Sequence, residues 1–428
     1  MRRTNEPIKL EYKHEMGDVL TYKETGRVQI EMEGVLDIIA GVKVKELMAV
    51  EHLSSKELKA LKRELKLIRG GLFYQRQEEY QKAKASFEKL IKQFPDSRWR
   101  ERVEGLLTQT LVSLASTFAN EEQWDDVIAT CQEAIRFDPD YADAHFWLGR
   151  AYRDKGLLDD AIAALNEAIH LNPDDDNAHH QLGHVYESKG MTDDAIAAFK
   201  EAIHLDPDDA EHHFCLGVAH CNQKMWDDAI RELQEAAQLD PDHTGIHFWL
   251  GFAYHNTEIF DDAIREMKEA VRLKPENSTY HHWLGSIYSV KGMWDDVLVA
   301  WKEAVKLDPD SDVVHFNLGY AYIHKEMFDE AIVELQEAVR LEPENAKAHF
   351  WLGNACYNKK LNDDAIAAFE ECIRLQPDDA YAYCELGHVY EDKGMTDDAI
   401  AAWQEAWRLE PDDTDIHDNL VRVTASQG

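Results

Sequence analysis

The chain has 428 residues, of which 44% are hydrophobic and only 11 are proline, so it can bury a core and is not a disordered polymer. Its formal net charge of -37 is uneven, because residues 1–107 hold 22 Lys and Arg against 18 Asp and Glu, whereas residues 108–428 hold 24 against 65. Most of this surface therefore repels nucleic-acid phosphate, and no apolar run approaches the length of a membrane span.

Residues 1–53 are expected to form a small β element. Apolar and polar residues alternate over 19–23 and again over 28–32, with a Thr-Gly pair between them, which predicts a β-hairpin. Residues 35–44 are a candidate third strand. We expect the element to cover the exposed end of a helical array; a dimerisation or docking element and the remnant of a larger β domain are the alternatives.

Residues 54–141 predict two irregular helical repeats. The first covers residues 64–97, and the second ends at Pro139. Pro95 and Pro139 lie 44 residues apart, whereas all later prolines of this series recur every 34. The first helix of the second repeat is therefore expected to be longer by nearly three turns.

From Pro139 onward the sequence has a fixed period of 34 residues. A proline recurs without exception at Pro139, Pro173, Pro207, Pro241, Pro275, Pro309, Pro343, Pro377 and Pro411. A Leu-Gly pair keeps the same step from Leu148-Gly149 to Leu386-Gly387. Such a period is typical of a solenoid, in which each repeat contacts only its neighbours.

Each repeat over residues 142–413 predicts two helices. In residues 142–175, apolar residues recur at helical spacing on both sides of Lys155-Gly156, and Asn172-Pro173 ends the second helix. Neither helix can bury its apolar face alone, so neighbouring helices must stack. The eight regular repeats are followed by an amphipathic segment, residues 414–428, which is expected to be a capping helix.

Acidic pairs recur where each second helix is expected to begin, as at residues 193–194, 227–228, 261–262, 329–330 and 363–364. Carboxylates at a helix start can satisfy free backbone N–H groups and complement the helix dipole. We interpret most of the acidity in this way. Selection for a basic partner, attracted by the negative field, is the alternative.

The repeat resembles a known family. With Ala142 as position one, the characteristic residues are Leu148, Gly149, Tyr152, Ala161, Leu165, Ala168 and Pro173. Their types and spacing resemble the tetratricopeptide repeat (TPR) family over about two-thirds of the chain. The resemblance implies an all-α, right-handed superhelical α-solenoid of helix-turn-helix repeats, with the β element at its N-terminal end. It also implies that function resides in a concave groove formed by the first helix of each repeat.

Histidine follows the same period at position four, as at His145, His179, His213, His247, His281, His315 and His349. Packed helices lie about 8–10 Å apart, so imidazoles at equivalent positions of stacked repeats are too distant to share an ion held by bonds of ~2 Å. We expect histidines that pack between the two helices of a repeat. The alternatives are a pH-sensitive joint and a metal site. We expect neither a metal nor a cofactor.

Catalysis is not expected. The sequence has no His-Glu-x-x-His, no Gly-x-Ser-x-Gly and no phosphate-binding glycine loop, and its paired carboxylates recur in every repeat rather than at one place. The six cysteines form no Cys-x-x-Cys and are expected to be reduced, buried thiols. No apolar run follows the two N-terminal arginines, so a cytoplasmic location is the expectation.

The resemblance places positions two, five, nine, twelve and thirteen of each repeat in the groove. The predicted groove residues are Phe146, Arg150, His180, His184, Phe214, Phe248, Phe252, His282, Phe316, Tyr320, Phe350, Asn354 and His388. Rings that do not pack against the next repeat would form an exposed apolar patch, which usually marks a binding surface. The types at position five exclude the carboxylate clamp by which some relatives bind acidic C-termini.

These observations favour a non-catalytic scaffold for protein–protein interaction. We expect it to bind an extended or helical protein segment with apolar anchors and basic flanks in the groove. Two alternatives remain open: a structural protein that self-assembles as a homo-oligomer, and an accessory subunit of an enzyme complex. Neither nucleic acid nor a membrane is an expected partner of the repeat array.

Overall fold

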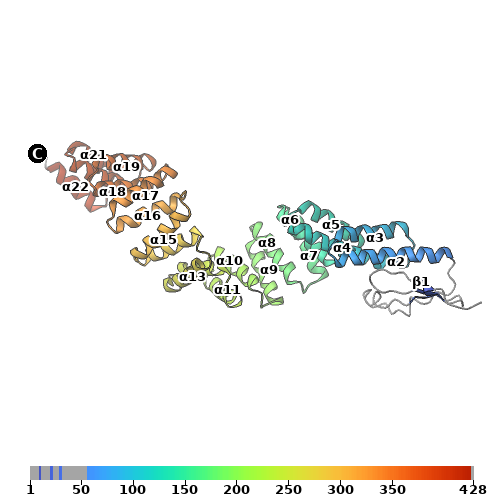
Figure 1. Ribbon diagram of the computed structural model, residues 1–428. Coiled ribbons are helices and arrows are strands. Elements are labelled where there is room, and N and C mark those ends of the chain that lie inside the picture. The colour runs from blue at the N-terminus through green and yellow to red at the C-terminus, as the bar shows by residue number, and fades with distance from the viewer. Residues whose placement is uncertain (1–8, 11–19, 23–27, 31–54, 426–428) are drawn as a thin grey trace, which may run out of the picture. The chain divides into compact units, whose positions relative to one another are not determined.

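The computed structural model describes residues 9–10, 20–22, 28–30 and 55–425, and two compact units divide the chain at residues 174 and 175 (Figure 1). The helices of the first unit are α2 (Ser55–Arg76), α3 (Tyr80–Gln93), α4 (Arg100–Asn120), α5 (Trp124–Phe137), α6 (Ala142–Asp154) and α7 (Leu158–Leu171). Those of the second unit are α8 (Asp176–Ser188), α9 (Thr192–Leu205), α10 (Ala210–Asn222), α11 (Trp226–Leu239), α12 (Thr244–Asn256), α13 (Phe260–Leu273), α14 (Ser278–Val290), α15 (Trp294–Leu307), α16 (Asp312–His324), α17 (Phe328–Leu341), α18 (Ala346–Asn358), α19 (Asn362–Leu375), α20 (Ala380–Asp392), α21 (Thr396–Leu409) and α22 (Thr414–Ala425). Among these helices, none has the length and apolar character that crossing a bilayer requires.

Three short strands precede the helices. They are β1 (Lys9–Leu10), β2 (Leu20–Tyr22) and β3 (Val28–Ile30), and they form an antiparallel sheet in the order β1-β2-β3. β2 and β3 pair as a hairpin in which Thr21 lies opposite Gln29, within the two segments for which the sequence predicts one. β1 was not predicted, and the candidate strand at residues 35–44 lies outside the described residues.

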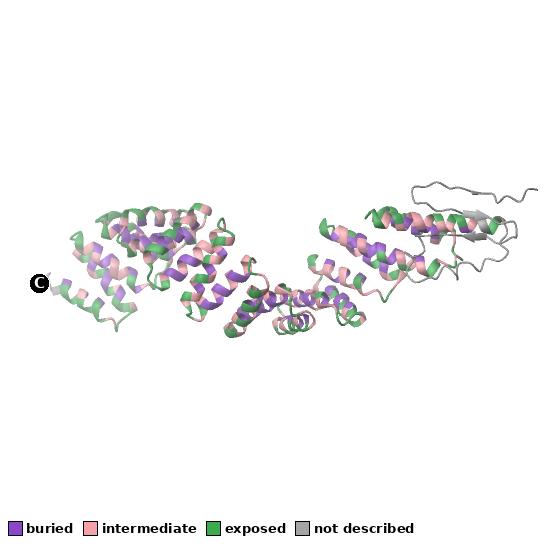
Figure 2. Cartoon of the chain, turned by 60° about the horizontal axis from the view of Figure 1, so that its bottom comes forward, coloured by how far each residue is buried: buried purple, intermediate pink, exposed green. Residues whose placement is uncertain are grey.

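Consecutive helices pack as hairpins, which gives the all-α solenoid that the period predicts. In the repeat of α6 and α7, Ala161 and Ala168 are fully buried, and Gly149 lies against Leu165. Buried residues line the facing sides of the helices and exposed residues cover the outer sides (Figure 2). Small residues at the contact allow the close approach, and stacking therefore supplies most of the stability.

The turn inside each repeat requires a left-handed residue after the first helix. Glycine holds this place in several repeats, with φ values of 76° at Gly190, 69° at Gly292 and 74° at Gly394. The N–H of each glycine donates a hydrogen bond to a carbonyl oxygen near the end of the first helix. Glycine adopts this conformation without the steric cost of a Cβ atom. Glu258 and Glu326 hold the same place with φ values of 61° and 56°, so the turn is kept where glycine is missing.

The repeats of the first unit differ in helix length. α4 has 21 residues, whereas α6, the first helix of the following repeat, has 13. The extra length amounts to little more than two helical turns, where the sequence predicts nearly three. Phe87 and Leu90 of α3 pack with Leu107 and Leu111 of α4 in a fully buried cluster, so the longer helix is held by an apolar core like those of the other repeats.

The acidic pairs lie in the first turn of the second helices, where they complement the helix dipole, but no N-cap side chain bonds to these helices, so the capping part of the interpretation is wrong. No side chain caps α13, and Asp261 in its first turn pairs instead with Lys291 of the next repeat. The same link joins Lys325 to Asp295 at 2.7 Å and, further along, recurs in Lys359–Asp329 and Lys393–Asp363. These pairs are exposed and contribute about 0–1 kcal/mol each, so they form a regular but weak link between neighbouring repeats.

Candidate functional site

The predicted groove residues lie on the first helices of their repeats. Except for His180, which is buried, their side chains are half-buried. They are therefore neither fully packed nor fully exposed, and each ring keeps one side against the protein. The structure brings three of these residues, Phe316, Tyr320 and Phe350, together in one pocket and leaves the others outside it.

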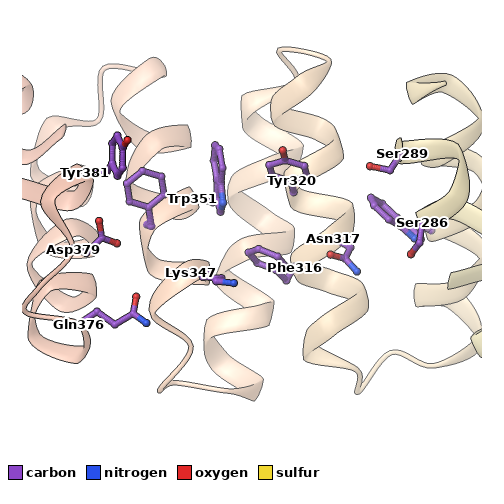
Figure 3. Close-up of a pocket in the computed structure, with 12 residues that line it drawn as sticks. Ser286, Ser289, Phe316, Asn317, Tyr320, Lys347, Trp351, Gln376, Asp379 and Tyr381 are labelled. Atoms are coloured by element: carbon purple, nitrogen blue, oxygen red, sulfur yellow. The ribbon is translucent and has the colours of Figure 1, made fainter. Parts of the chain in front are cut away.

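A pocket with a volume of about 640 Å³ lies on α14, α16 and α18 in the second unit and reaches α20. Its lining residues are Ser286, Ser289, Trp301, Phe316, Asn317, Tyr320, Lys347, Phe350, Trp351, Gln376, Asp379 and Tyr381. Figure 3 shows Phe316, Tyr320 and Trp351 in the middle with Lys347 beside them, Tyr381, Asp379 and Gln376 at one end, and Ser286 and Ser289 at the other. The pocket thus has an aromatic centre with one lysine beside it and polar residues at its ends.

The rings of the pocket hold one another in edge-to-face contact. The centroid of Trp351 lies 4.9 Å from that of Tyr320 and 5.3 Å from that of Phe350, at interplanar angles of 74° and 88°. Phe350 in turn lies 5.7 Å from the buried ring of Phe369. Aromatic pairs of this geometry fix ring orientation. Tyr381 is 60% exposed, so the pocket offers one preformed apolar surface and one ring free to close on a ligand.

Phe316, Tyr320 and Phe350 are the predicted groove residues that meet in this pocket. Phe248 and Phe252 do not line it. Phe248 lies 5.3 Å from Tyr280, and Phe252 lies 5.0 Å from Trp283, so these two rings form a separate aromatic group on α12 and α14. Phe214 contacts His243 at 5.0 Å.

The remaining predicted residues make individual contacts. In the second unit, His282 Nε2 is 2.9 Å from Asn317 Nδ2, the ring of His388 lies 5.4 Å from that of Trp403, and Asn354 accepts hydrogen bonds from Asn358. In the first unit, Phe146 lies 5.5 Å from Trp147, and the Arg150 guanidinium lies 5.2 Å from the Trp147 ring. His180 and His184, at the start of the second unit, contact Cys215. None of these residues lines the pocket.

Sequence reasoning missed position six. Trp351 stands there and forms the centre of the pocket, and Asn317 holds the same position one repeat earlier. A signal existed, because tryptophan recurs at position six in Trp147, Trp249, Trp283 and Trp351. In two repeats this ring packs edge-to-face on the position-nine ring of the preceding repeat, as Trp351 does on Tyr320. Position six therefore joins the first helices of neighbouring repeats along the groove.

The histidines at position four form hydrogen bonds with backbone carbonyl groups in addition to packing between the helices. His247 Nε2 lies 2.9 Å from the carbonyl oxygen of Pro241, and His213, His281, His315 and His349 make the same contact with the preceding proline. This contact ties the start of each repeat to the proline that ends the one before. A periodic histidine is thus a structural connection, with one ring nitrogen committed in each case.

We expect the stability of the second unit to fall as the pH rises through the raised pKa of His213. The Glu232 carboxylate bonds to His213 Nδ1 at 2.9 Å and raises the pKa of His213 above its ordinary value of 6.5, against the opposing effect of burial. The contribution of protonated His213 to the free energy of unfolding is therefore complete below pH 6.5. It is lost as the pH rises through the raised pKa of His213. The same bond lowers the pKa of Glu232 from 4.5, so that contribution is lost on acidification.

The measurement is the urea unfolding free energy of His213→Gln and the parent chain from pH 5 to 9. Hydrogen bonds to charged groups contribute about 1.5–3 kcal/mol, so the variant should lose stability near pH 6 and show a flatter decline toward pH 9. His349→Gln is the matched control, because Ala368 stands where Glu232 stands in the His213 repeat. Equal pH profiles for the parent and His213→Gln would contradict the expectation.

The six cysteines are free, and five of them are buried, as the sequence predicts. Burial raises the pKa of the Cys131 and Cys221 thiols to about 12 and that of Cys356 to about 11. The thiolate is the reactive form. These side chains are therefore unreactive core residues at neutral pH.

Comparison with known proteins agrees with the fold. Models of tetratricopeptide repeats match residues 67–97, 130–163, 149–190, 180–244, 222–287, 316–380 and 368–401. No curated protein sequence matches the chain. The matched segments together extend over well over half of the sequence.

Similar solved structures include the C-terminal part of a TPR repeat-containing protein from Cytophaga hutchinsonii, which is 15% identical, with a TM-score of 0.50 over 56% of this chain and 99% of that one. MamA is 31% identical, with a TM-score of 0.37 over 38% of this chain and 95% of its own. YrrB, described as a TPR protein with an unusual peptide-binding site, is 22% identical, with a TM-score of 0.41 over 44% and 96%.

Tetratricopeptide repeats are in general scaffolds for protein–protein interaction and are typically non-catalytic. The helix pairs, the 34-residue period and the matches to the repeat models all agree. The chain therefore belongs to the tetratricopeptide repeat family.

Proposed function

We propose that the chain is a non-catalytic scaffold that binds a protein segment in the groove of its second unit, at the pocket between Phe316, Tyr320, Phe350 and Trp351. The observation that carries the proposal is the exposed aromatic surface of this pocket. Its rings come from two consecutive first helices, and they are half-buried rather than hidden in the core. Aromatic residues of this kind carry much of the binding energy at protein interfaces.

The chemistry of the pocket favours an apolar anchor with a basic flank. An aromatic or aliphatic side chain of the ligand can pack on the rings of Phe350 and Trp351, and the exposed ring of Tyr381 lines the same pocket. Lys347 also lines the pocket, so lysine or arginine of the ligand is expected at the end formed by Asp379, toward the acidic surface of the surrounding repeats. Because the ring contacts preform the surface, little ordering is required of the scaffold on binding.

Tyr381→Ala should weaken segment binding by about tenfold or more, since truncating an aromatic hot spot costs at least about 2 kcal/mol. The probe is a library of displayed random peptides selected on the full chain, followed by fluorescence anisotropy with the enriched peptides. We expect enrichment of an apolar residue flanked by lysine or arginine. Tyr381 is exposed and outside the core, so its loss should leave the melting temperature unchanged.

Val333→Ala is the matched control, because Val333 is 63% exposed on α17, a second helix, and does not line the pocket. It should bind the selected peptides as the parent does. Equal affinity of the parent and Tyr381→Ala would refute the pocket as the binding site. A mass that rises with concentration in light scattering and falls in Tyr381→Ala would instead make it a self-association surface, in favour of the self-assembling alternative.

The predicted cytoplasmic location belongs to the same proposal. It is supported by the six free cysteines, five of them buried. Thiols persist in reducing compartments, whereas disulfides are common in secreted proteins. The location does not affect the binding chemistry proposed above.

A further inference from the structure

Two histidines and a cysteine converge at a second place in the second unit. His180 and His184 stand one turn apart on α8, and Cys215 stands on α10, the first helix of the next repeat. Cys215 Sγ lies 3.3 Å from His180 Nε2 and 3.7 Å from His184 Nε2, and all three ligand atoms lie within 4.8 Å of one another. Within the residues that the structure describes, no other group of this kind comes so close.

The convergence follows from repeat geometry. Position five of one repeat meets position six of the next, and the same geometry brings His282 to Asn317 at 2.9 Å three repeats further on. Position nine lies one helical turn after position five, so its side chain reaches the same place. Only one pair of repeats has His, His and Cys at these three positions. The position-four histidines are a separate series.

The distances suit a tetrahedral ion. Zinc–sulfur bonds of ~2.3 Å and zinc–nitrogen bonds of ~2.0 Å at a tetrahedral angle separate sulfur and nitrogen by ~3.5 Å. The observed separations of 3.3 and 3.7 Å lie on either side of this value. Sulfur and imidazole nitrogen together are the donor set that zinc prefers over calcium or magnesium.

The surroundings favour ligation. His180 and Cys215 are 7% and 5% exposed, and the ring of Phe199 lies within 5.6 Å of both imidazoles, so the site has an apolar wall. His184 Nδ1 lies 3.2 Å from Glu187 Oε2. A proton on Nδ1 donated to this carboxylate leaves the Nε2 lone pair directed at the sulfur, which is the arrangement found around metal-bound histidines.

Two further residues, His212 and Glu211, lie beside the group of His180, His184 and Cys215. The imidazole of His212 is 1% exposed and lies 4.7 Å from that of His180; among the described residues its Nδ1 has no hydrogen-bond partner. Glu211 Oε1 lies 3.8 Å from Cys215 Sγ. Glu211 is not within 4.8 Å of all three ligand atoms, so its side chain would have to move to complete a tetrahedron, and a water molecule can do so instead.

We propose that His180, His184 and Cys215 bind one zinc ion, which links α8 to α10. On binding, the zinc–sulfur bond replaces the S–H bond, and the thiol proton leaves to solvent. Because a thiol must lose its proton to bind zinc, the affinity of the site increases with pH. The ion joins two neighbouring repeats and therefore stabilises the contact on which a solenoid depends.

The test uses the full chain, treated with a chelator and then titrated with Co²⁺, which reports thiolate ligation through its charge-transfer absorption and tetrahedral geometry through its visible bands. We expect one equivalent of Co²⁺ to produce both signals, Zn²⁺ to abolish them by displacement, and Zn²⁺ to raise the melting temperature. Cys215→Ser should lose the charge-transfer band, and His184→Gln should bind at least tenfold more weakly.

Cys384→Ser is the matched control, because Cys384 Sγ lies 3.9 Å from His388 Nε2 on the same helix but belongs to no three-ligand group among the described residues. It should leave both cobalt signals unchanged. The proposal is overturned if the parent shows no charge-transfer band, or if Cys215→Ser retains it. In that case the three side chains form only a hydrogen-bonded group, with the thiol donating to an imidazole. Circular dichroism without metal checks that each variant is folded.

Discussion

Gly285→Ala is expected to lose about 3 kcal/mol of unfolding free energy, the upper end of the cost of overpacking a core. A Cβ atom at this position would lie 2.4 Å from both Cδ1 and Nε1 of Trp301, a separation that packed carbon atoms do not adopt. Trp301 is 3% exposed, and its Nε1 donates a 2.9 Å hydrogen bond to the carbonyl of His282. The indole cannot move aside without losing this bond or opening a cavity beside α15.

Gly251→Ala separates this steric cost from the effect of helix propensity. Gly251 holds the same position in another repeat, but its Cβ would lie 3.3 Å from two backbone atoms, the Ala263 oxygen and the Met267 nitrogen, and would meet no atom closer than that. Both substitutions gain about 1 kcal/mol of helix propensity, so the difference between them measures packing. Urea unfolding of both variants is the measurement. Equal unfolding free energies would show that the indole contact does not set the requirement for glycine.

The sequence predicts the fold because the same residue types recur at the same positions of each repeat. The proline every 34 residues ends the second helix, the Leu-Gly pair marks the helix contact, and the alanines of α7 and its equivalents are buried as their spacing predicts. Residue types with few conformational options set these elements. The irregular distance between Pro95 and Pro139 indicated the longer α4 for the same reason.

The sites are less predictable, because periodicity says which residues are equivalent but not which atoms meet. Position six was overlooked, although Trp351 is central to the pocket. The acidic pairs looked like caps, yet Asp295 reaches Lys325 of the following repeat. Such contacts join residues 30 or 35 positions apart, and their geometry depends on how neighbouring repeats stack rather than on any one helix.

The group of His180, His184 and Cys215 is the clearest case of this limit. Histidines at one position of successive repeats are too far apart to share a metal ion. Side chains at different positions of neighbouring repeats can lie much closer together. The structure places position five beside position six of the next repeat, and only then does a single cysteine among many aromatic residues become a candidate ligand.

Leu420→Asp is expected to detach α22 and to expose the last helix pair. Leu420 is 9% exposed and packs in a cluster with Trp403 and Ala399 of α21. A carboxylate in this cluster would be buried without a partner, at a cost of several kcal/mol. Undocking α22 costs less, because among the described helices its main contact is with α21. Trp403, now fully buried, would then face solvent.

The control is Val421→Asp, one residue away on the same helix, where the side chain is 50% exposed and substitution should change stability by no more than about 0.5 kcal/mol. Limited proteolysis distinguishes the two, since an undocked α22 is cleaved and a docked one is protected. Leu420→Asp should also increase self-association, because an exposed apolar repeat end can stack on another copy. If both variants resist cleavage equally, α22 stays docked in Leu420→Asp, and the burial of Leu420 against Trp403 is not what holds this helix in place.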